Sequence, residues 1–550
     1  MRVLSLILAL SALPAAALAD SPLTIQQGAD PLGATSDYSQ FLMGRYAMAS
    51  GNAERAAAAY AAVGELPSED RPLVENAFVS ALFAGEIDLA ARLAPDMTEA
   101  STLLKESARL AQLLQALKQG RGADAEVLIQ TPLEGPHAGV GALLKPIAQA
   151  MVGRWDVATA APEGEQQPVQ ALFGEYHRAL LLEHQRRFDE ADVIYQRLLT
   201  QSAPMSLFVE PYARFLERQG KRREARQVRA AHASDLDSGL PVFQPPQGLP
   251  SLTEIAALAL TEQAGMAMSA ESNELAAVYL RMALYLQPHT PGAWAALGDV
   301  LDGADMDAAA RAAWQRVSPT DPYYSAALTQ LAFNLQAAGQ GANAIATARR
   351  AVEAASAAER DNALMALAGV LNAEGRYAEA LAALDQLRQP LAQQPWQTRF
   401  TRGVAFERLD RFAEAEAEFQ AALALNANSA EVLNYLGYMW VDRGVKVDEG
   451  TALIERAAAI EPSSGAIQDS LGWARFRQGQ YELAVTLLET AVLAEPSDPD
   501  INEHLGDAYL QVGRRREAAY QWRRVLTLEP TDAQRAAVEA KLRDLEADAG

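Results

Sequence analysis

Apolar and small residues recur along most of the chain with two superimposed periods. Within segments of about a dozen residues they lie three and four positions apart, which predicts amphipathic α-helices. The helical segments come in pairs, and the pairs recur about every 34 residues. No segment combines strand alternation with a motif that would need a strand. The pattern therefore predicts an all-α chain built from repeated helix pairs.

The repeat is clearest in the unit that begins at Pro499. Its diagnostic positions are Leu505, Gly506, Tyr509, Ala518, Trp522 and Pro530. This is the tetratricopeptide (TPR) pattern, in which small residues let two antiparallel helices approach closely and large residues fill the gap between units. A proline then ends the second helix. One such pair cannot bury its own apolar face, so we expect neighbouring units to stack into a superhelical solenoid.

The units define a domain organisation. Eight units in register cover 257–530, and a weaker, irregular TPR-like series covers 37–233, which together predict about fourteen helix pairs in two blocks. Between the blocks, 234–256 is rich in proline and glycine and is expected to be a linker. A polar capping helix and tail are expected at 531–550, and an N-terminal arm at 20–36.

Residues 1–19 have the pattern of a secretory signal peptide. Arg2 precedes a short apolar run, and Ala17-Leu18-Ala19 supplies a small-x-small cleavage site. The alternative is a membrane anchor, but the run is too short to span about 30 Å of hydrocarbon comfortably. No later stretch has about 18 uninterrupted apolar residues. We therefore expect an exported protein of the bacterial periplasm, with no transmembrane segment after cleavage.

Composition narrows the classes of partner and chemistry. The 550 residues include 47 Lys and Arg against 70 Asp and Glu, a net charge of −23. Such a field repels phosphate backbones, so nucleic acid is not an expected partner. The chain has no cysteine, which excludes disulfides, thiolate metal sites, cysteine nucleophiles and lipid attachment through cysteine.

Catalytic and metal-binding motifs are scarce in this sequence. His177 and His184 lie seven residues apart and could share a helix face, but a metal would need two further ligands. There is no phosphate-binding glycine loop and no nucleophile elbow. Two basic clusters, 221–229 and 514–524, are explained either as solvated helix faces or as docking points for an acidic protein or lipid headgroups. We expect no metal, no cofactor and no enzymatic activity.

The concave groove is the strongest candidate for function. In a TPR superhelix, positions 2, 5, 9 and 12 of each unit face inward and are free to contact a ligand. In the last four units they supply the expected partner-binding set of Phe400, Asn434, Tyr438, Asp469, Trp473, Phe476, Glu503 and Asp507. Aromatic anchors edged with carboxylates suit an extended peptide or a partner helix. The alternative is that some of these aromatic side chains only pack against the neighbouring repeat.

One known TPR mechanism does not fit this groove. The clamp for chaperone C-termini uses Lys at position 5 with Asn at position 9, and no unit here has Asn at position 9. A groove this acidic would also repel a terminal carboxylate. Basic or apolar segments are therefore the expected ligands.

Three C-terminal runs resemble one group of TPR proteins. They are LNYLGYMWVDRG, AIQDSLGWARFRQGQYELAVTLLETAV and DPDINEHLGDAYLQVGRRREAAYQWRRVL, and YSQFLMGRYAMASGNAERAAAAY looks like the opening repeat of the same group. This group is the outer-membrane TPR lipoprotein family of proteobacteria, whose best-known members are adaptors of a periplasmic carboxy-terminal-processing serine protease. The clearest match covers 433–526. The chain lacks the family's lipid-bearing cysteine, so membrane anchoring does not carry over.

These observations lead to two functional hypotheses. The first is a non-enzymatic periplasmic scaffold or adaptor that holds a peptide or partner protein in the groove. Its partner would be a processing protease or an envelope-assembly factor, and its own association with the envelope would be peripheral. The second is a glycan- or peptidoglycan-associated protein, in which the groove's aromatic and acidic residues contact sugars.

Overall fold

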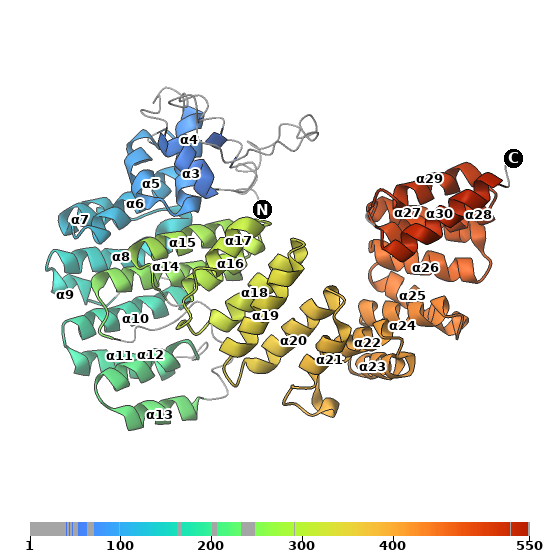
Figure 1. The fold of residues 1–550 in the computed structure, drawn as a ribbon. Helices are drawn as coiled ribbons and strands as arrows, with labels where there is room; N and C mark the ends of the chain where they lie inside the picture. Colours follow the sequence, from blue (N-terminus) through green and yellow to red (C-terminus); the bar gives the residue numbers. More distant parts are fainter. Residues whose placement is uncertain are drawn as a thin grey trace. The chain divides into compact units, whose positions relative to one another are not determined.

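The computed structural model describes most of the chain as helices (Figure 1). It describes residues 40, 43, 44 and 47 and the range 53–547, with gaps at 63–70, 98, 162–167, 201–205, 233–247, 291 and 529. The predicted signal peptide and N-terminal arm lie outside the described residues. Every regular element in the described part is helical, and the prediction of an all-α TPR solenoid is confirmed.

The chain divides into two compact units, Met1–Leu335 and Gln336–Gly550. The helices described in the first unit are α3 (Ala53–Ala62), α4 (Arg71–Ala84), α5 (Ile87–Leu93), η2 (Ala94–Met97), α6 (Thr102–Lys118), α7 (Gly122–Gln130), η3 (Gly135–His137), α8 (Ala138–Met151), α9 (Trp155–Ala158), α10 (Pro168–His184), α11 (Phe188–Thr200), α12 (Ser206–Arg218), α13 (Arg222–Ala231), α14 (Leu252–Ser269), α15 (Asn273–Leu286), α16 (Ala293–Asp302) and α17 (Asp307–Trp314). Helix α18 (Tyr324–Ala337) contains the junction between the units.

The N-terminal helices pair as TPR units do, but irregularly. Helices α4, α6, α8, α10 and α12 are the first helices of successive pairs, and each packs on the helix that follows it. Helix α9 has only four residues. Pro146 lies inside α8 and Pro211 inside α12, where each removes a backbone hydrogen bond. These irregular helices lie in the half of the chain in which the TPR consensus residues are sparse.

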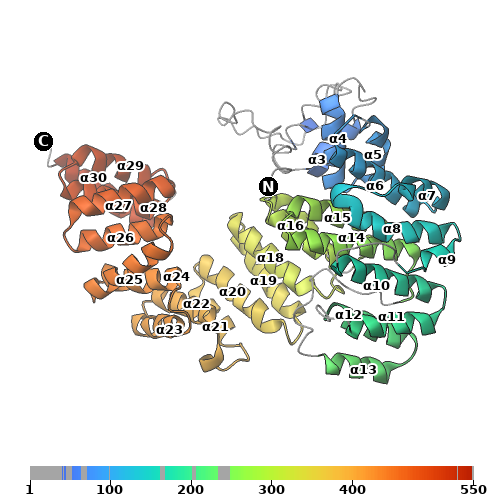
Figure 2. The ribbon, with the colours of Figure 1, turned by 180° about the vertical axis from the view of Figure 1, so that it is seen from behind.

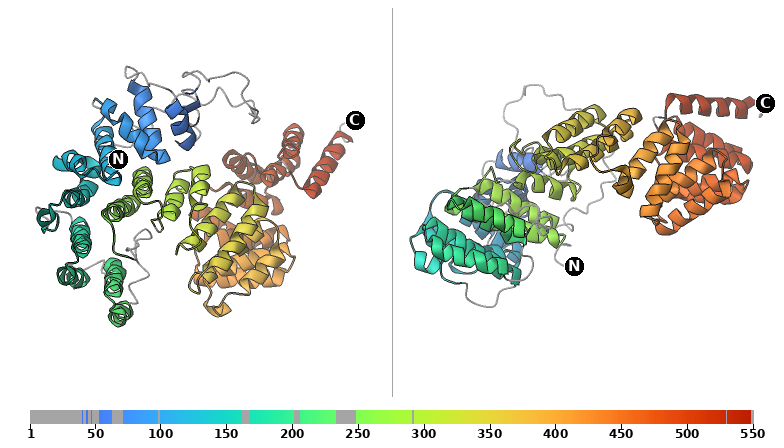
Figure 3. Two further views of the ribbon diagram at one scale, coloured as in Figure 1. Left: turned by 60° about the vertical axis from the view of Figure 1, so that its left-hand side comes forward. Right: turned by 90° about the horizontal axis from the view of Figure 1, so that it is seen from below.

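Helices α14 and α15 lie against the row of N-terminal first helices (Figures 1 and 2). Helix α14 packs on α8 and α10, while α15 packs on α4 and α6. First helices line the concave side of a TPR array, so this pair occupies that side of the first unit, inside the curve seen in Figure 3, left. Every residue from Ile255 to Gly265 is buried, as in a helix that has protein on all sides.

This packing differs from the expected division into blocks. The sequence pattern assigned residues from 257 onward to the C-terminal block, whereas α14 and α15 belong to the first compact unit. Helix α14 also begins at Leu252, inside the segment expected to be a linker. Ser251 and Glu254 form a capping box at its N-terminus. Residues 233–247 of that segment lie outside the described part, so the linker remains a prediction there.

The second unit is a regular stack of helix pairs. After α18 it contains α19 (Gly341–Ala354), α20 (Arg360–Ala373), α21 (Tyr377–Leu384), η5 (Leu391–Gln393), α22 (Trp396–Arg408), α23 (Phe412–Leu425), α24 (Ala430–Asp442), α25 (Val447–Ile460), α26 (Gly465–Arg477), α27 (Tyr481–Ala494), α28 (Pro499–Gln511), α29 (Arg515–Val525) and α30 (Asp532–Ala547). The pairs pack through small residues. A Cβ on Gly437 of α24 would lie 2.7 Å from the carbonyl oxygen of Gly450 in α25, so the two backbones touch at that point.

Helix α30 covers the end of the stack. Thr531 Oγ1 accepts a hydrogen bond from the Gln534 amide at 3.2 Å, which satisfies one free N–H at the helix N-terminus. Val538 is fully buried against the cluster that contains Leu505 and Trp522. Among the described residues, no helix has the length and apolar character that crossing a membrane would require.

Candidate functional site: the inner face of the second unit

The eight predicted groove residues lie on four consecutive first helices of the second unit. These helices are α22, α24, α26 and α28, and each packs on the next one in the row. Phe400 lies on α22, Asn434 and Tyr438 on α24, Asp469, Trp473 and Phe476 on α26, and Glu503 and Asp507 on α28. Most of them are half-buried, as expected of side chains that line a surface between core and solvent.

A parallel aromatic stack forms the centre of this face. The Trp473 ring lies 4.7 Å from that of Phe476, with an angle of 7° between their planes. On α28, the His504 ring lies 4.2 Å from Trp473 at 16°. Trp473 Nε1 donates to Asp442 Oδ1 at 3.1 Å. The structure thus brings together two predicted residues, and adds His504 and Asp442, which the sequence analysis did not select.

His504 links the stack to a buried carboxylate. Its Nδ1 lies 3.0 Å from both oxygens of Asp469, and Asp469 is only 6% exposed. Burial lowers the pKa of His504, but the carboxylates of Asp469, Asp500 and Asp507 outweigh that effect and raise its pKa above the ordinary 6.5. The protonated ring then balances part of the acidic charge of this face.

Tyr438 and Asn434 present polar groups next to the stack. Burial raises the pKa of Tyr438 above its ordinary range, and Asp442 and Asp469 act in the same direction. The phenol therefore stays protonated and can donate a hydrogen bond. Asn434 Oδ1 is buried and has no hydrogen-bond partner in the described part of the chain. The Asn434 amide thus retains unused hydrogen-bonding capacity.

Glu503 and Asp507 are engaged by the capping helix. Lys541 Nζ of α30 donates to Glu503 Oε1 and to both carboxylate oxygens of Asp507, each at 2.7 Å. Asp507 also accepts from Trp522 Nε1 at 3.0 Å. A hollow of about 290 Å³ adjoins these groups and is lined in part by Phe476 and Leu545. At this end, the inner face already holds a lysine presented by a helix.

Phe400 is placed differently from Trp473. Its ring packs on Phe419 at 5.9 Å and edge-on to Tyr435 at 5.0 Å. Phe419 is a fully buried member of the core cluster of α22–α24, and Tyr435 packs against that cluster. For this residue the structure favours the alternative considered from sequence, packing against the adjacent repeat.

Carboxylates are crowded along the face. Burial raises the pKa values of Glu407, Glu431 and Asp500, and like charges nearby add to each shift: Asp410 and Asp442 for Glu407, Glu461 for Glu431, and Asp498 for Asp500. A raised carboxyl pKa means that the ionised form is disfavoured where it stands. An incoming cation would relieve that cost.

The inner side of the first unit is closed by polar as well as apolar contacts to α14 and α15. His177 Nε2 lies 2.8 Å from Glu262 Oε2, and His137 Nδ1 lies 2.9 Å from the Tyr279 hydroxyl. His184 instead stacks on Trp155, so His177 and His184 do not converge on one site. No group of three or more potential metal ligands occurs among the residues that the structure describes.

One arginine of each basic cluster forms ion pairs within the chain. Arg229 Nε lies 2.7 Å from Glu210, and its Nη1 lies 2.6 Å from Glu217. Arg514 pairs with Glu489 and Glu517, each at 3.0 Å. These contacts fit the explanation of charged, solvated helix faces.

Comparison with known proteins identifies TPR repeats. Family models described as tetratricopeptide repeat and TPR repeat match residues 400–465 and 472–513. A TPR repeat-containing protein of Pseudomonas aeruginosa is 33% identical over 112 residues, which is 19% of this chain and 19% of that protein. The chain thus matches about a fifth of the length of this curated relative.

Several solved structures resemble the chain at low sequence identity. The Cut9–Hcn1 assembly of the APC/C matches with 13% identity and a TM-score of 0.40, covering 88% of this chain and 96% of that one. MamA from Desulfovibrio magneticus matches with 20% identity and a TM-score of 0.27, covering 31% of this chain and 94% of that one. The chain is a TPR repeat protein with an all-helical solenoid fold.

Proposed function

We propose that this protein is a non-enzymatic scaffold that holds a peptide or partner protein against the inner face of α22–α28. The observation that carries the proposal is the row of half-buried aromatic and acidic side chains on these first helices, centred on Trp473. TPR repeats suggest a protein-binding role, and the inner side of the first unit is filled by the chain's own α14 and α15. The second unit therefore offers the better binding surface.

The expected ligand is a basic or apolar segment. Carboxylates with raised pKa values favour an incoming lysine or arginine, and half-buried aromatic rings favour apolar or cationic side chains. Lys541 illustrates the chemistry, since it is held by Glu503 and Asp507 and its Nζ lies 5.8 Å from the Trp522 ring. We further propose a periplasmic location, on the basis of residues 1–19, and a partner such as a processing protease or an envelope-assembly factor.

Binding to a glycan is the second candidate. The flat stack of Trp473 and Phe476, next to the carboxylates of Asp442 and Asp469, is a surface on which a sugar ring could stack and form hydrogen bonds. Peptidoglycan would be the ligand in an envelope location.

Affinity capture with the chain from Asp20 onward tests both candidates. Baits would be the unaltered sequence, a variant with Tyr438→Ala and Trp473→Ala, and the control Tyr520→Ala, which removes an aromatic ring that is 62% exposed on α29. Circular dichroism would verify folding. We expect partners from an envelope extract, identified by mass spectrometry, to be retained by the control and lost from the double variant.

The outcomes separate the candidates. Equal capture by all three baits would refute the inner face as the binding surface. If no protein is captured but the unaltered chain sediments with purified sacculi, and the double variant does not, the glycan function replaces the scaffold. Loss of binding together with loss of helical signal would call for Asp442→Asn, a smaller change at the edge of the same face.

A further inference from the structure

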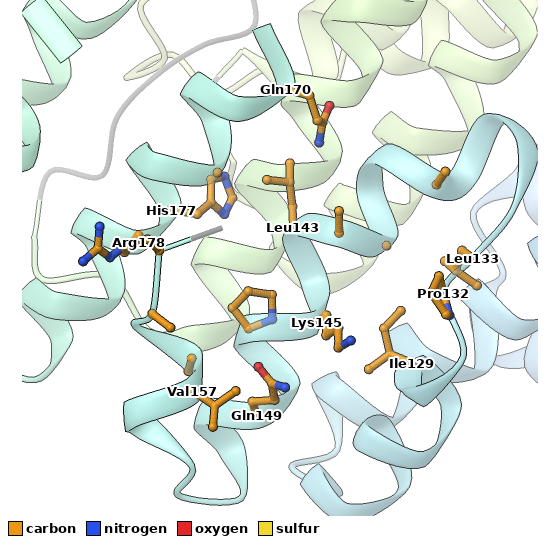
Figure 4. Close-up of a pocket in the computed structure, with 18 residues that line it drawn as sticks. Ile129, Pro132, Leu133, Leu143, Lys145, Gln149, Val157, Gln170, His177 and Arg178 are labelled. Carbon is orange, nitrogen blue, oxygen red and sulfur yellow. The ribbon is translucent and has the colours of Figure 1, made fainter. Parts of the chain in front are cut away.

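A cavity of about 420 Å³ lies between α8, α9 and α10 in the first unit (Figure 4). This volume is within the range of small-molecule pockets, about 300–1,000 Å³. Its apolar walls include Leu133, Leu143, Pro146 and Val157. It lies outside the proposed partner surface, and the repeat pattern gives no indication of it.

The polar side chains that line the cavity are two cations, two amides and one imidazole. They are Lys145, Gln149, Gln170, His177 and Arg178. No aspartate or glutamate lines the cavity among the described residues, although the chain carries a net charge of −23. Such a local reversal of charge favours an anionic ligand.

The two cations differ in availability. Arg178 Nε donates to the Thr159 carbonyl at 2.7 Å, and its guanidinium lies 3.5 Å from Glu175. Lys145 is exposed, and no ion pair of this side chain occurs within the described part of the chain. Lys145 therefore remains able to attract an anion to the cavity.

His177 contributes a buried, unused nitrogen. The residue is 1% exposed, and its Nε2 lies 2.8 Å from Glu262 Oε2. Its Nδ1 has no hydrogen-bond partner in the part of the chain that the structure describes, and neither does Glu262 Oε1. Because a buried polar atom without a hydrogen-bond partner is unfavourable, a ligand that pairs with Nδ1 recovers that cost.

The charge of the pair decides what Nδ1 can bind. A net negative charge buried between α10 and α14 would be expensive, and burial raises the pKa of Glu262 accordingly. Within the described residues Glu262 Oε1 has no partner that could accept a hydroxyl proton, so the carboxyl proton is on Oε2 and is donated to Nε2. Because Nε2 then accepts, the imidazole proton is on Nδ1. Nδ1 is therefore a donor, and it requires an acceptor.

We propose that this cavity binds a small apolar monocarboxylate. Its carboxylate accepts the Nδ1–H hydrogen bond of His177 in the positive field of Lys145 and Arg178, and its hydrocarbon part lies along Leu143 and Val157. Aliphatic acids and aromatic acids share this chemistry, and the experiment distinguishes them.

Isothermal titration calorimetry on the full chain tests the proposal. The probes are decanoate and 2-naphthoate, each compared with its neutral alcohol. We expect saturable binding at one site for at least one acid, and about tenfold weaker binding for its alcohol, because a charged acceptor strengthens a hydrogen bond by about 1.4 kcal/mol. Tighter binding of decanoate would identify the ligand as an aliphatic acid, and tighter binding of 2-naphthoate would identify it as an aromatic acid.

Variants at exposed positions locate the site without disturbing the core. Ala142 is exposed and lines the cavity, so Ala142→Trp should abolish binding by filling the opening. Lys145→Glu should weaken binding about three- to tenfold, since it replaces an attraction with a repulsion. Lys105→Glu, on α6 and outside the lining, makes the same charge change and should leave the affinity unchanged.

A nuclear magnetic resonance readout is specific to His177. Binding of the acid should shift the His177 Nδ1 resonance, while that of His232 stays in place. The proposal is overturned by the absence of saturable binding of either acid, by equal affinities for acid and alcohol, or by binding that survives Ala142→Trp. None of these results bears on the partner surface of the second unit, so the two proposals can fail separately.

Discussion

Gly506→Ala tests whether close helix packing holds the last repeat together. Gly506 of α28 faces Trp522 of α29, and an added Cβ would lie 2.5 Å from the Cδ1 and Nε1 atoms of that ring. Trp522 is 1% exposed, and its Nε1 donates to Asp507 at 3.0 Å. The ring can therefore move aside only by breaking this hydrogen bond or by shifting α29.

The expected cost follows from three terms. Overpacking of a dense core costs about 1–3 kcal/mol, and loss of the indole hydrogen bond adds about 1 kcal/mol. Alanine is the better helix former by about 1 kcal/mol, which offsets part of that cost. We expect Gly506→Ala to lower the local free energy of unfolding of α28–α30 by about 1–3 kcal/mol.

Hydrogen exchange is the appropriate assay, because the terminal repeats of a solenoid open without the rest. Amide exchange in α28 and α29 should accelerate by about five- to 150-fold, while α20 and α21 keep the exchange rates of the unaltered chain. The second test repeats Gly506→Ala in a Trp522→Ala background. Without the indole the clash is absent, so the substitution should become neutral or stabilising.

The direction of the change in exchange rate shows whether close packing limits stability here. If Gly506→Ala slows exchange in the otherwise unaltered chain, helix propensity outweighs packing and the close approach does not limit stability. If the substitution destabilises equally in both backgrounds, the Cβ does not act through Trp522. Gly298, which faces Trp314 at 2.4 Å from Cδ1 in the same way, provides an independent repetition.

Three further predictions concern titration and the cap. Burial lowers the pKa of His137 to about 4. As pH falls from 6.5 to 4 the unfolded chain binds a proton that the folded chain does not, so the free energy of unfolding of the first unit decreases by up to about 3 kcal/mol. Urea denaturation at several pH values should show this decrease in the unaltered chain and a smaller one in His137→Gln. The pKa of His504 is raised, so protonated His504 stabilises the fold fully below pH 6.5, and this stabilisation disappears as pH rises through the raised pKa. Asp469→Asn should remove this pH dependence from the hydrogen exchange of α28. An unchanged pH profile of exchange would contradict the pairing of His504 with Asp469. Lys541→Met should speed amide hydrogen exchange in α30 a few-fold, and the difference should become smaller in high salt because salt screens ion pairs. A difference that does not depend on salt would mean that apolar packing, and not the ion pairs of Lys541, holds α30.

The fold of the second unit was predictable because its rules are local. Gly437, Gly472 and Gly506 recur at equivalent positions, and each meets atoms of the following helix at a distance that only glycine tolerates. The large residue Trp522 follows at the expected spacing and is buried. Each contact joins residues less than one repeat apart, so a single sequence contains the information.

The position of α14 and α15 was not predictable in the same way. Their contacts join His137 to Tyr279, 142 residues apart in the sequence, and His177 to Glu262, 85 residues apart. A TPR-like spacing predicts the helix pair but not which face it covers. One clue was present: the run IAALALTEQAG at 255–265 has few charges on any face, which is unusual for a helix with a solvent-exposed side.

The candidate site was predictable by position but not by partner. Inward-facing positions gave Tyr438, Trp473 and Phe476 on consecutive first helices. The residues that complete the site lie at other positions: His504 is one residue after an inward-facing one, and Lys541 belongs to the capping helix. Repeat frames identify which positions face inward, whereas hydrogen bonds across repeats depend on side-chain geometry.

The contrast between the inner sides of the two units explains why binding is assigned to the second. In the first unit, α14 is buried on all sides along 255–265, and its Gln263 is hydrogen-bonded to Gln170. On the second unit, half-buried rings at Trp473 lie among carboxylates whose charge the described chain only partly balances. A face that the chain's own helices cover offers no open surface to a partner protein. A face with crowded carboxylates and, among the described residues, an unpaired acceptor at Asn434 Oδ1 gains both charge balance and hydrogen bonds, which is the physical basis for expecting a basic ligand there.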